Sequence, residues 1–176
     1  MKQTNIKETN MISQISPAKE LRAFTVLDLE NQCGGADKVP YYSKEISRQF
    51  KSISLPVPTQ TVVAVGTMAL SLCPQLAFDF QGARILSRAG IDGADKCLCE
   101  VLLEEATATR SKYVVIGSGD NMFAEPAEIL KANGSTIIVV ARRGSLSYKL
   151  YKVADQVIYL NDKAFHQGST DIKGPA

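Results

Sequence analysis

The sequence has few of the residues on which zinc sites and disulfide frameworks depend. It contains a single histidine and four cysteines, and none of the cysteines belongs to a CxxC pair; they are Cys33, Cys73, Cys97 and Cys99. Protein zinc sites combine closely spaced cysteines and histidines, whereas disulfide frameworks belong mainly to small secreted domains. We therefore predict reduced and mostly buried cysteines in a cytoplasmic protein.

Long apolar runs and a glycine-rich phosphate-binding loop are also missing. The longest apolar stretches, such as residues 62–65 and 137–140, fall far short of the roughly 20 residues that a membrane helix needs. Residues 1–20 lack an apolar core of signal-peptide type. We therefore expect no contact with a membrane and no secretion, and a phosphatase or nucleotide-binding enzyme ranks last among the candidate functions. The net charge of +2 neither requires nor excludes a nucleic-acid partner.

What the chain does contain is an alternation of short β-rich runs and helical patterns. The β-rich runs lie at residues 23–29, 61–65, 83–87, 113–117, 136–140 and 156–159. The helical patterns lie between them, at residues 41–52, 70–78, 93–108, 122–133 and 146–153. Several runs are continuously apolar, which is typical of parallel strands covered by helices on both faces. We predict an α/β domain over residues 21–162, a three-layer α/β/α fold with a mainly parallel sheet of five or six strands.

The two ends of the chain lack the alternating pattern of the predicted domain. Residues 1–20 and 163–176 are polar and show no periodicity, which predicts a flexible N-terminal arm and a flexible C-terminal tail.

Three aspartates fall where predicted strands end or the following helices begin. Asp28 ends the first strand, Asp95 opens the helix after the third strand, and Asp120 directly follows the fourth strand. Because ligands of open parallel sheets bind outside the carboxyl ends of the strands, we expect the three side chains to converge. Clustered carboxylates repel one another unless a cation neutralises them, and Mg²⁺ or Mn²⁺ suits oxygen ligands. For any one aspartate the competing interpretation is a helix N-cap, and Asp120 is well placed to be one.

Five further residues are predicted to bind substrate at the same edge of the sheet: Asn31, Ser118, Arg142, Arg143 and Ser145. The asparagine and Ser118 are expected either to position the aspartates or to contact the substrate. The two arginines and Ser145 follow the fifth strand, where they would bind a phosphate backbone, although a solvated surface is the alternative for the arginines. Other candidates for this basic surface are Arg84, Arg88, Lys149 and Lys152.

Four motifs then occur in a recognisable order. They are an Asp-x-x-Asn motif at residues 28–31, a Gly-x-Asp helix start at residues 93–95, Ser-Gly-Asp-x-x-Phe at residues 118–123, and a leucine-bearing helix followed by Ala-Asp and an apolar strand at residues 145–158. In order and spacing they resemble the NYN domains, a branch of the PIN-like ribonuclease superfamily. The resemblance covers about residues 23–160. It departs from the family at Asp92, which stands in the place of a lysine.

The resemblance implies metal-dependent cleavage of RNA phosphodiester bonds, with RNA as the partner and a homodimer possible. It makes Asp28, Asp95 and Asp120 both the catalytic residues and the ligands of Mg²⁺ or Mn²⁺. Met122 replaces the second aspartate of the family's Ser-Gly-Asp-x-Asp motif, and a thioether is a poor ligand for Mg²⁺. The alternative is therefore a catalytically weakened module of the same fold that binds RNA or a protein.

Overall fold

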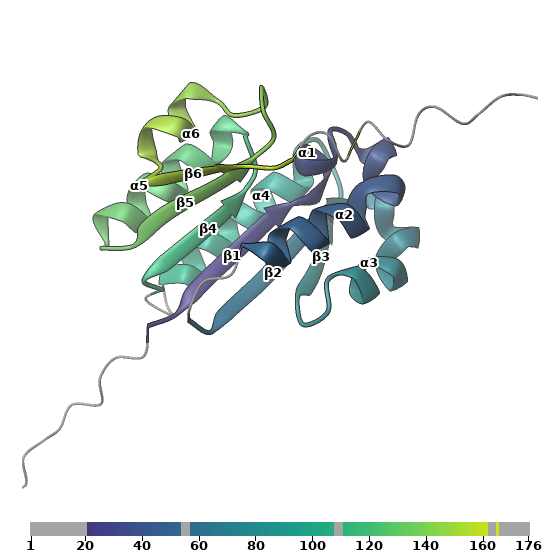
Figure 1. The fold of residues 1–176 in the computed structure, drawn as a ribbon, viewed down its shortest axis with the longest axis horizontal. Helices are drawn as coiled ribbons and strands as arrows, with labels where there is room; N and C mark the ends of the chain where they lie inside the picture. The colour runs from purple at the N-terminus through teal and green to yellow at the C-terminus, as the bar shows by residue number, and fades with distance from the viewer. Residues whose placement is uncertain (1–20, 54–56, 108–110, 162–164, 166–176) are drawn as a thin grey trace, which may run out of the picture.

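The computed structural model describes residues 21–53, 57–107, 111–161 and 165, apart from the side chains of residues 68–70 (Figure 1). Within this part of the chain, six strands form one parallel sheet in the order β3-β2-β1-β4-β5-β6. The strands are β1 (Ala23–Asp28), β2 (Thr59–Gly66), β3 (Arg84–Arg88), β4 (Tyr113–Gly117), β5 (Thr136–Ala141) and β6 (Gln156–Tyr159). The order reverses direction between β1 and β4, the position at which open sheets of this kind bind ligands.

Strand register brings the ends of β1 and β4 together. Leu27 lies opposite Gly117, the last residue of β4, and Asp28 lies opposite Ala64 of β2. Asp28 and Ser118 therefore both follow this Leu27–Gly117 pair, one residue beyond it on adjacent strands.

Helices cover both faces of the sheet (Figure 1). The α-helices are α1 (Leu29–Cys33), α2 (Val39–Ser52), α3 (Cys73–Asp79), α4 (Gly93–Val101), α5 (Ala124–Ala132) and α6 (Tyr148–Val153). Shorter turns are η1 (Ala36–Lys38), η2 (Thr67–Leu72), the π-helical η3 (Leu102–Ala106) and η4 (Asn121–Phe123). Among the described residues, no helix has both the length and the apolar character needed to cross a bilayer.

The core is divided into two clusters by the sheet. One cluster joins the sheet to α4, α5 and α6 through residues such as Leu98, Leu130 and Leu150. The other joins the opposite face to α1, α2 and α3, where Ile46 and Leu76 are fully buried. The strands between the two clusters are apolar on both faces, so the continuously apolar runs correctly predicted a sheet covered on both sides. The predicted three-layer α/β/α class is confirmed, with a sheet that has six strands and is entirely parallel.

The largest differences from the predicted helices lie in two segments. The segment predicted from residue 70 begins as the 3-10 turn η2, and the α-helix starts at Cys73, with a proline in its first turn. The segment predicted for residues 93–108 is α-helical only to Val101 and continues as the π-helical turn η3, and its last residue lies outside the described part of the chain.

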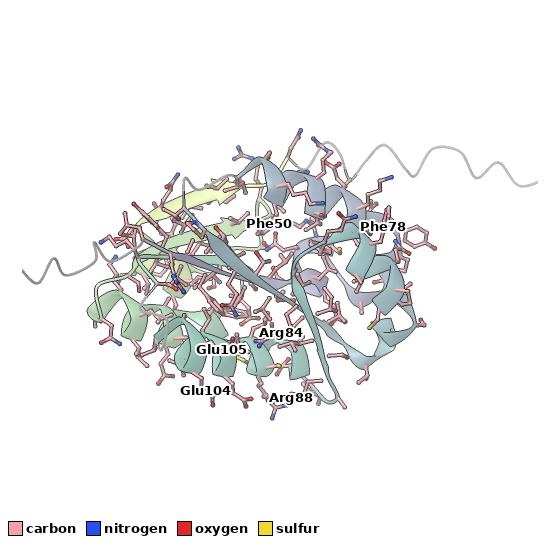
Figure 2. The ribbon with its side chains drawn as sticks, turned by 90° about the horizontal axis from the view of Figure 1, so that it is seen from below. Phe50, Phe78, Arg84, Arg88, Glu104 and Glu105 are labelled. Atoms are coloured by element: carbon pink, nitrogen blue, oxygen red, sulfur yellow. The ribbon has the colours of Figure 1, made fainter. Side chains whose placement is uncertain are left out.

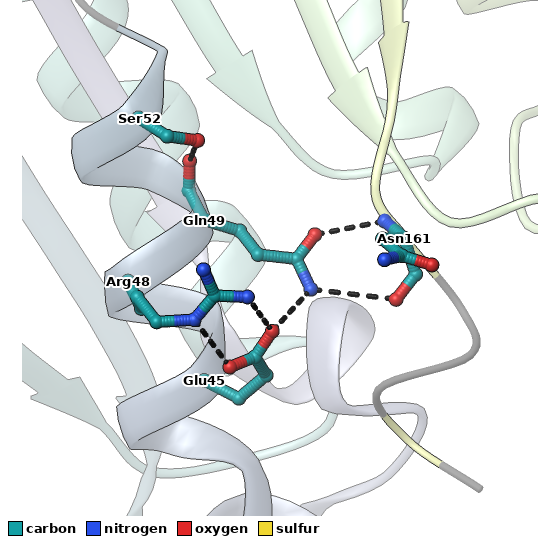
Figure 3. Close-up of polar contacts among 5 residues, drawn as sticks. All are labelled: Glu45, Arg48, Gln49, Ser52 and Asn161. Carbon is teal, nitrogen blue, oxygen red and sulfur yellow. Dashed lines mark hydrogen bonds and ion pairs between the residues drawn. The ribbon is translucent and has the colours of Figure 1, made fainter.

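The chain after β6 returns across α2. The Gln49 side chain accepts a hydrogen bond from the Asn161 backbone N–H (2.8 Å) and donates one to the Asn161 carbonyl (3.4 Å; Figure 3). Phe165 is buried, its ring centroid lies 5.2 Å from that of Tyr42, and its carbonyl accepts a hydrogen bond from the Tyr42 hydroxyl (2.8 Å). One aromatic residue of the predicted tail, Phe165, therefore packs against the core. Residues 1–20 and the rest of that tail, 163–164 and 166–176, lie outside the described residues.

Candidate functional site

Asp28 lies at the sheet edge where β1 passes directly into α1, and only 4% of its surface is exposed. Its Oδ1 accepts a hydrogen bond from the Asn31 backbone N–H (3.1 Å), so the carboxylate is the N-cap of α1. Its Oδ2 accepts a hydrogen bond from the Ser118 hydroxyl at the end of β4 (3.0 Å). Both oxygens are thus fixed by neighbouring elements, and the side chain is held in one orientation.

Asp95 reaches Asp28 from the first turn of α4. The start of that helix lies close against the end of β3, since a Cβ on Gly93 would come within 2.5 Å of the Arg88 carbonyl oxygen. A hydrogen bond joins the Asp28 and Asp95 carboxyl groups. Burial, followed by the charge of Asp95, raises the pKa of Asp28 to about 8. Burial also raises the pKa of Asp95, while its hydrogen bond with Asp28 opposes that rise. Burial and the neighbouring carboxyl group therefore favour the protonated form of Asp28 at neutral pH.

Asp120 lies beside this pair but is engaged elsewhere. Its Oδ1 accepts a hydrogen bond from the Met122 backbone N–H (2.8 Å) and so caps η4. Its negative charge still contributes to the raised pKa of Asp95. Asp120 is thus both an N-cap and a neighbour of the other acids. Among the described residues, no group of three or more His, Cys, Asp or Glu side chains is arranged closely enough to hold a metal ion. The site is an acidic pair with a third acid nearby, not a preformed cage of three carboxylates.

The acidic pair fits a hard divalent cation. Mg²⁺ in proteins is commonly held by one or two carboxylates and keeps several of its waters, so two oxygen donors suffice. The Asp95 Oδ1 atom is buried and has no hydrogen-bond partner among the described residues, which leaves an acceptor to be satisfied. Ionisation of both carboxyl groups would leave two negative charges in contact, and a cation removes that repulsion.

Ser118 and Asn31 hold the acids in place. Ser118 is completely buried, and its hydroxyl donates to Asp28 and accepts from the Asp120 backbone N–H (3.2 Å). The Asn31 side-chain carbonyl accepts a hydrogen bond from the Gly119 backbone N–H (3.0 Å). Of the two roles expected for these residues, the geometry favours positioning over contact with a substrate.

The loop after β5 packs against the loop that carries Asp120. The Ser147 backbone N–H donates to the Gly119 carbonyl (2.8 Å), and a Cβ on Gly119 would lie only 2.6 Å from the Ser145 carbonyl carbon. The Ser145 hydroxyl donates to the Arg142 carbonyl (3.0 Å). Ser145 is therefore near the acids as predicted, with its hydroxyl proton used within its own loop.

The two predicted phosphate-binding arginines point to different surroundings. Arg142 is half-buried against Gly34, and its guanidinium carbon lies 5.5 Å from the centroid of the Phe165 ring. Arg143 is exposed, and its guanidinium carbon lies 5.1 Å from the centroid of the Tyr159 ring. Both follow β5 at the expected edge, but each guanidinium lies against an aromatic ring instead of the acidic pair.

Arg84 and Arg88 do not extend a phosphate-binding surface. Arg84 forms an ion pair with Glu105 of η3, and Arg88 forms one with Glu100 of α4 (2.7 Å). In Figure 2, Arg84 is labelled next to Glu105. Their charges are neutralised by neighbours on that helix.

Sequence reasoning assigned no role at the site to Cys99. Cys99 lies one helical turn after Asp95 on α4, so the two share a face, and this spacing could have identified it. Its thiol donates to the Met122 carbonyl (3.7 Å), and burial, followed by the charge of Asp95, raises its pKa to about 12. The neutral thiol thus lies near the acidic pair and is hydrogen-bonded to the backbone of Met122.

Two further acids affect the pair from its rim. Glu30 accepts a hydrogen bond from the Gly66 backbone N–H (2.8 Å) at the end of β2. Asp92 precedes α4 with a left-handed backbone (φ 56°), a conformation that aspartate tolerates better than most residues. The charges of both residues raise the pKa of Asp95.

A cavity of about 470 Å³ lies elsewhere, between the sheet and the C-terminal half of α2. Thr25, Thr61 and Phe50 are among the residues that line it, and none of the predicted site residues does. The acidic pair is therefore a site on the edge of the sheet, separate from this cavity.

The fold and the site together define a parallel α/β domain with a partly buried acidic pair at the point where the strand order reverses. No protein-family model matches the chain, and no curated protein matches it. Among solved structures, a protein of unknown function from Vibrio parahaemolyticus is similar, with a TM-score of 0.59 and 13% identity over 82% of this chain and 96% of that one. The YcaC gene product of Escherichia coli, described as an octameric hydrolase of unknown specificity, has a TM-score of 0.47 and 19% identity over 80% of this chain and 76% of that one. The first of these likenesses supports the fold class alone.

Proposed function

We propose that this protein is a metal-dependent ribonuclease of NYN type, in the PIN-like superfamily. The observation that carries the proposal is the Asp28–Asp95 pair, in which the carboxyl group of buried Asp28, at the end of β1, is hydrogen-bonded to that of half-buried Asp95, in the first turn of α4. Keeping a buried and a half-buried acid in contact costs free energy, and binding a cation to them is the function that explains this cost most directly.

In this proposal each residue has a defined task. Asp28 and Asp95 would hold Mg²⁺ or Mn²⁺, with Asp120 beside them as a third acid. Ser118 and Asn31 keep the aspartates in position through the hydrogen bonds described above. The bound ion supplies a water of lowered pKa and stabilises the charge that develops on the phosphodiester. Asp28 would have to give up its proton to serve as a ligand.

A second candidate is a binding module of the same fold with little or no nuclease activity. It is favoured by the surroundings of Met122, where the family's fourth acid is replaced by a thioether and the Cys99 thiol lies alongside. Neither sulfur group is a good ligand for Mg²⁺. Such a module would retain RNA or a protein partner without cleaving it.

Cleavage of RNA in the presence of Mn²⁺ tests the first candidate. We expect the wild-type protein to cleave RNA with Mn²⁺ and not with EDTA, and we expect Asp28→Asn and Asp95→Asn each to reduce the rate by at least roughly 100-fold. Glu128→Gln, which removes an exposed acid of α5, is the matched control and should leave the rate unchanged. Equal rates in the wild type and both aspartate variants would exclude the assignment.

Met122→Asp separates the two candidates. The substitution restores the acid that the family carries at this position, beside Asp120 and Cys99. If the wild type binds RNA but does not cleave it, while Met122→Asp does, the protein is a weakened module. If the wild type cleaves RNA and Met122→Asp only raises the rate, it is an active nuclease that works with three acids.

A further inference from the structure

The outer face of α6 carries only aromatic and basic side chains. Leu150 and Val153 of this helix are buried against the sheet, and the other four residues are exposed. Tyr148 is 73% exposed and Tyr151 is 55% exposed, which is unusual for rings of this size. The two lysines, at 149 and 152, lie between and beside these rings, and the Lys152 Nζ atom is 5.5 Å from the centroid of Tyr148.

The edge strand β6 extends this surface. Val157 packs against the same core cluster as α6, whereas Ile158 packs against the other, so strand alternation places Tyr159 on the α6 side. Arg143 lies over the Tyr159 ring, which is 41% exposed. We call the combined surface the α6 face; its members are Arg143, Tyr148, Lys149, Tyr151, Lys152 and Tyr159.

The charge of the α6 face has one sign. The chain has no acidic residue between Glu128 and Asp155, although acids and bases are nearly equal in number over the whole sequence. Asp155, at the end of this stretch, is paired with Lys131 (2.7 Å). Within the described part of the chain, no carboxylate forms an ion pair with Arg143, Lys149 or Lys152. The face is therefore locally basic in a protein of low net charge.

The α6 face begins next to the loop that carries Asp120. Ser147 caps α6 through its side chain, and its backbone N–H donates to the carbonyl of Gly119, between Ser118 and Asp120. The helix also packs against η4, the turn that carries Met122. A flexible polymer lying along α6 would consequently reach the loop that holds Asp120.

We propose that the α6 face is a binding platform for single-stranded RNA, with unpaired bases stacked on its tyrosines and phosphates bound by Arg143, Lys149 and Lys152. Aromatic rings that alternate with cations suit such a strand, whose bases expose their faces and whose backbone is anionic. Duplex RNA keeps its base faces hidden. The centre of a protein interface is usually apolar and depleted of lysine, unlike this surface. The choice of RNA as the polymer rests on the function proposed above, but binding to the face requires no metal and no cleavage.

Fluorescence anisotropy in EDTA tests the platform on the full chain. The probe is a labelled 12-nucleotide oligouridine, compared with a blunt RNA duplex of the same length. We expect Tyr148→Leu and Tyr151→Leu each to weaken binding of the single strand by roughly 5- to 100-fold, because leucine removes the ring that stacks. Tyr148→Phe, which keeps the ring, should bind like the wild type. Tyr41→Leu, at a 79% exposed tyrosine of α2, is the matched control and should have no effect.

The salt dependence of binding tests the cations. We expect Lys149→Gln and Lys152→Gln each to lower the slope of log affinity against log salt concentration by about 0.7, the value for one lost phosphate contact on a single strand. Lys44→Gln, at an exposed lysine of α2, should leave the slope unchanged.

Several results would overturn the platform. One is an absence of single-strand binding by the wild type. Another is binding by Tyr148→Leu and Tyr151→Leu that is as tight as that of the wild type or no weaker than that of Tyr41→Leu. Sedimentation could also show that the leucine variants split a dimer while RNA affinity is unchanged, which would make the α6 face an interface between two copies of the chain. Because the assay contains EDTA, its outcome is independent of catalysis. RNA binding through the α6 face without Mn²⁺-dependent cleavage would contradict only the nuclease proposal. Mn²⁺-dependent cleavage by a protein whose RNA affinity does not depend on the α6 face would contradict only the platform.

Discussion

Asp28 is a carboxyl group whose surroundings favour its protonated form. It is buried, it faces a second carboxyl group, and only two hydrogen bonds, from the Asn31 backbone and the Ser118 hydroxyl, favour its charged form. Its folded-state pKa of about 8 lies well above the value of about 4 in an unfolded chain. Between these two pH values the native protein holds a proton that the unfolded chain releases. The stability of the metal-free protein therefore falls as the pH rises from about 4 to about 8.

Asp28→Asn should remove this pH dependence. In urea denaturation with EDTA, we expect the variant to gain stability relative to the wild type between pH 5 and pH 8.5, by an amount on the order of a few kcal/mol. The gain arises because the amide carries no charge to desolvate at high pH. Glu128→Gln should follow the wild-type curve at both pH values. A difference between Asp28→Asn and the wild type that stays constant across this range would show that Asp28 does not titrate as described.

The positions of the three aspartates were predictable from the sequence, but their contacts were not. Each follows or precedes a strand whose apolar run is easy to recognise, so their common edge could be predicted from topology alone. That Asp28 and Asp95 form the close pair, while Asp120 caps η4, depends on side-chain directions in the first turns of helices. Such directions are set by packing and not by spacing, and the sequence alone could not supply them. The same limit applies to Arg142 and Arg143, whose aromatic neighbours come from distant parts of the chain.

Among the elements, the loops after β4 and β5 depend on one glycine. At Gly119 an added Cβ would run into the backbone of Ser145, which cannot move without shifting the whole loop. At Gly66, by contrast, an added Cβ would lie 2.8 Å from Oε1 of Glu30, at the flexible end of that side chain. The position of Asp120 is thus set by contact between two loops.

We expect Gly119→Ala to destabilise the protein by about 1–3 kcal/mol, because the overpacked loops must separate. The affinity for Mn²⁺ should fall at the same time, since the loop carries Ser118 and Asp120. Gly66→Ala should cost clearly less stability. Chemical denaturation of the three proteins measures the first effect, and equal stabilities of Gly119→Ala and the wild type would contradict the packing of these loops.

The C-terminal segment is an element that periodicity does not reveal. Phe165 stands alone among polar residues, so no pattern marks it, yet it is packed between Tyr42 and Arg142. The strands, in contrast, were predictable to within about two residues at each end. Buried parallel strands have continuous runs of apolar residues, and surface loops do not. Isolated anchoring residues are therefore where sequence reasoning fails first.

Phe165→Ala should lower the free energy of unfolding by about 3 kcal/mol, as expected when a buried aromatic side chain is removed. Phe78→Ala, at a 71% exposed phenylalanine of α3 (Figure 2), is the matched control and should change stability by less than about 0.5 kcal/mol. Thermal or urea denaturation distinguishes the two variants. Similar losses in both would show that Phe165 does not anchor the segment.

At the scale of the whole molecule, the reversal of strand order between β1 and β4 gathers the acids on one edge. The basic α6 face begins at the same edge, through the contact between Ser147 and Gly119. The proposed ion site and the proposed RNA platform are therefore neighbours, although Asp28 and Tyr148 are far apart in the sequence. This arrangement is what a nuclease needs, with a surface that holds the strand beside the groups that act on it.

Calorimetric titration with Mn²⁺ in buffers of different ionisation enthalpy tests the central claim most directly. If Asp28 and Asp95 bind the ion, binding at pH 7 should release close to one proton per ion, because the pKa of Asp28 is about 8 and the ligand must be ionised. The release should fall toward zero by about pH 9, and Asp28→Asn should bind at least about tenfold more weakly, whereas Glu128→Gln should bind like the wild type. Absence of Mn²⁺ binding by the wild type, or equal binding by Asp28→Asn, would contradict the account.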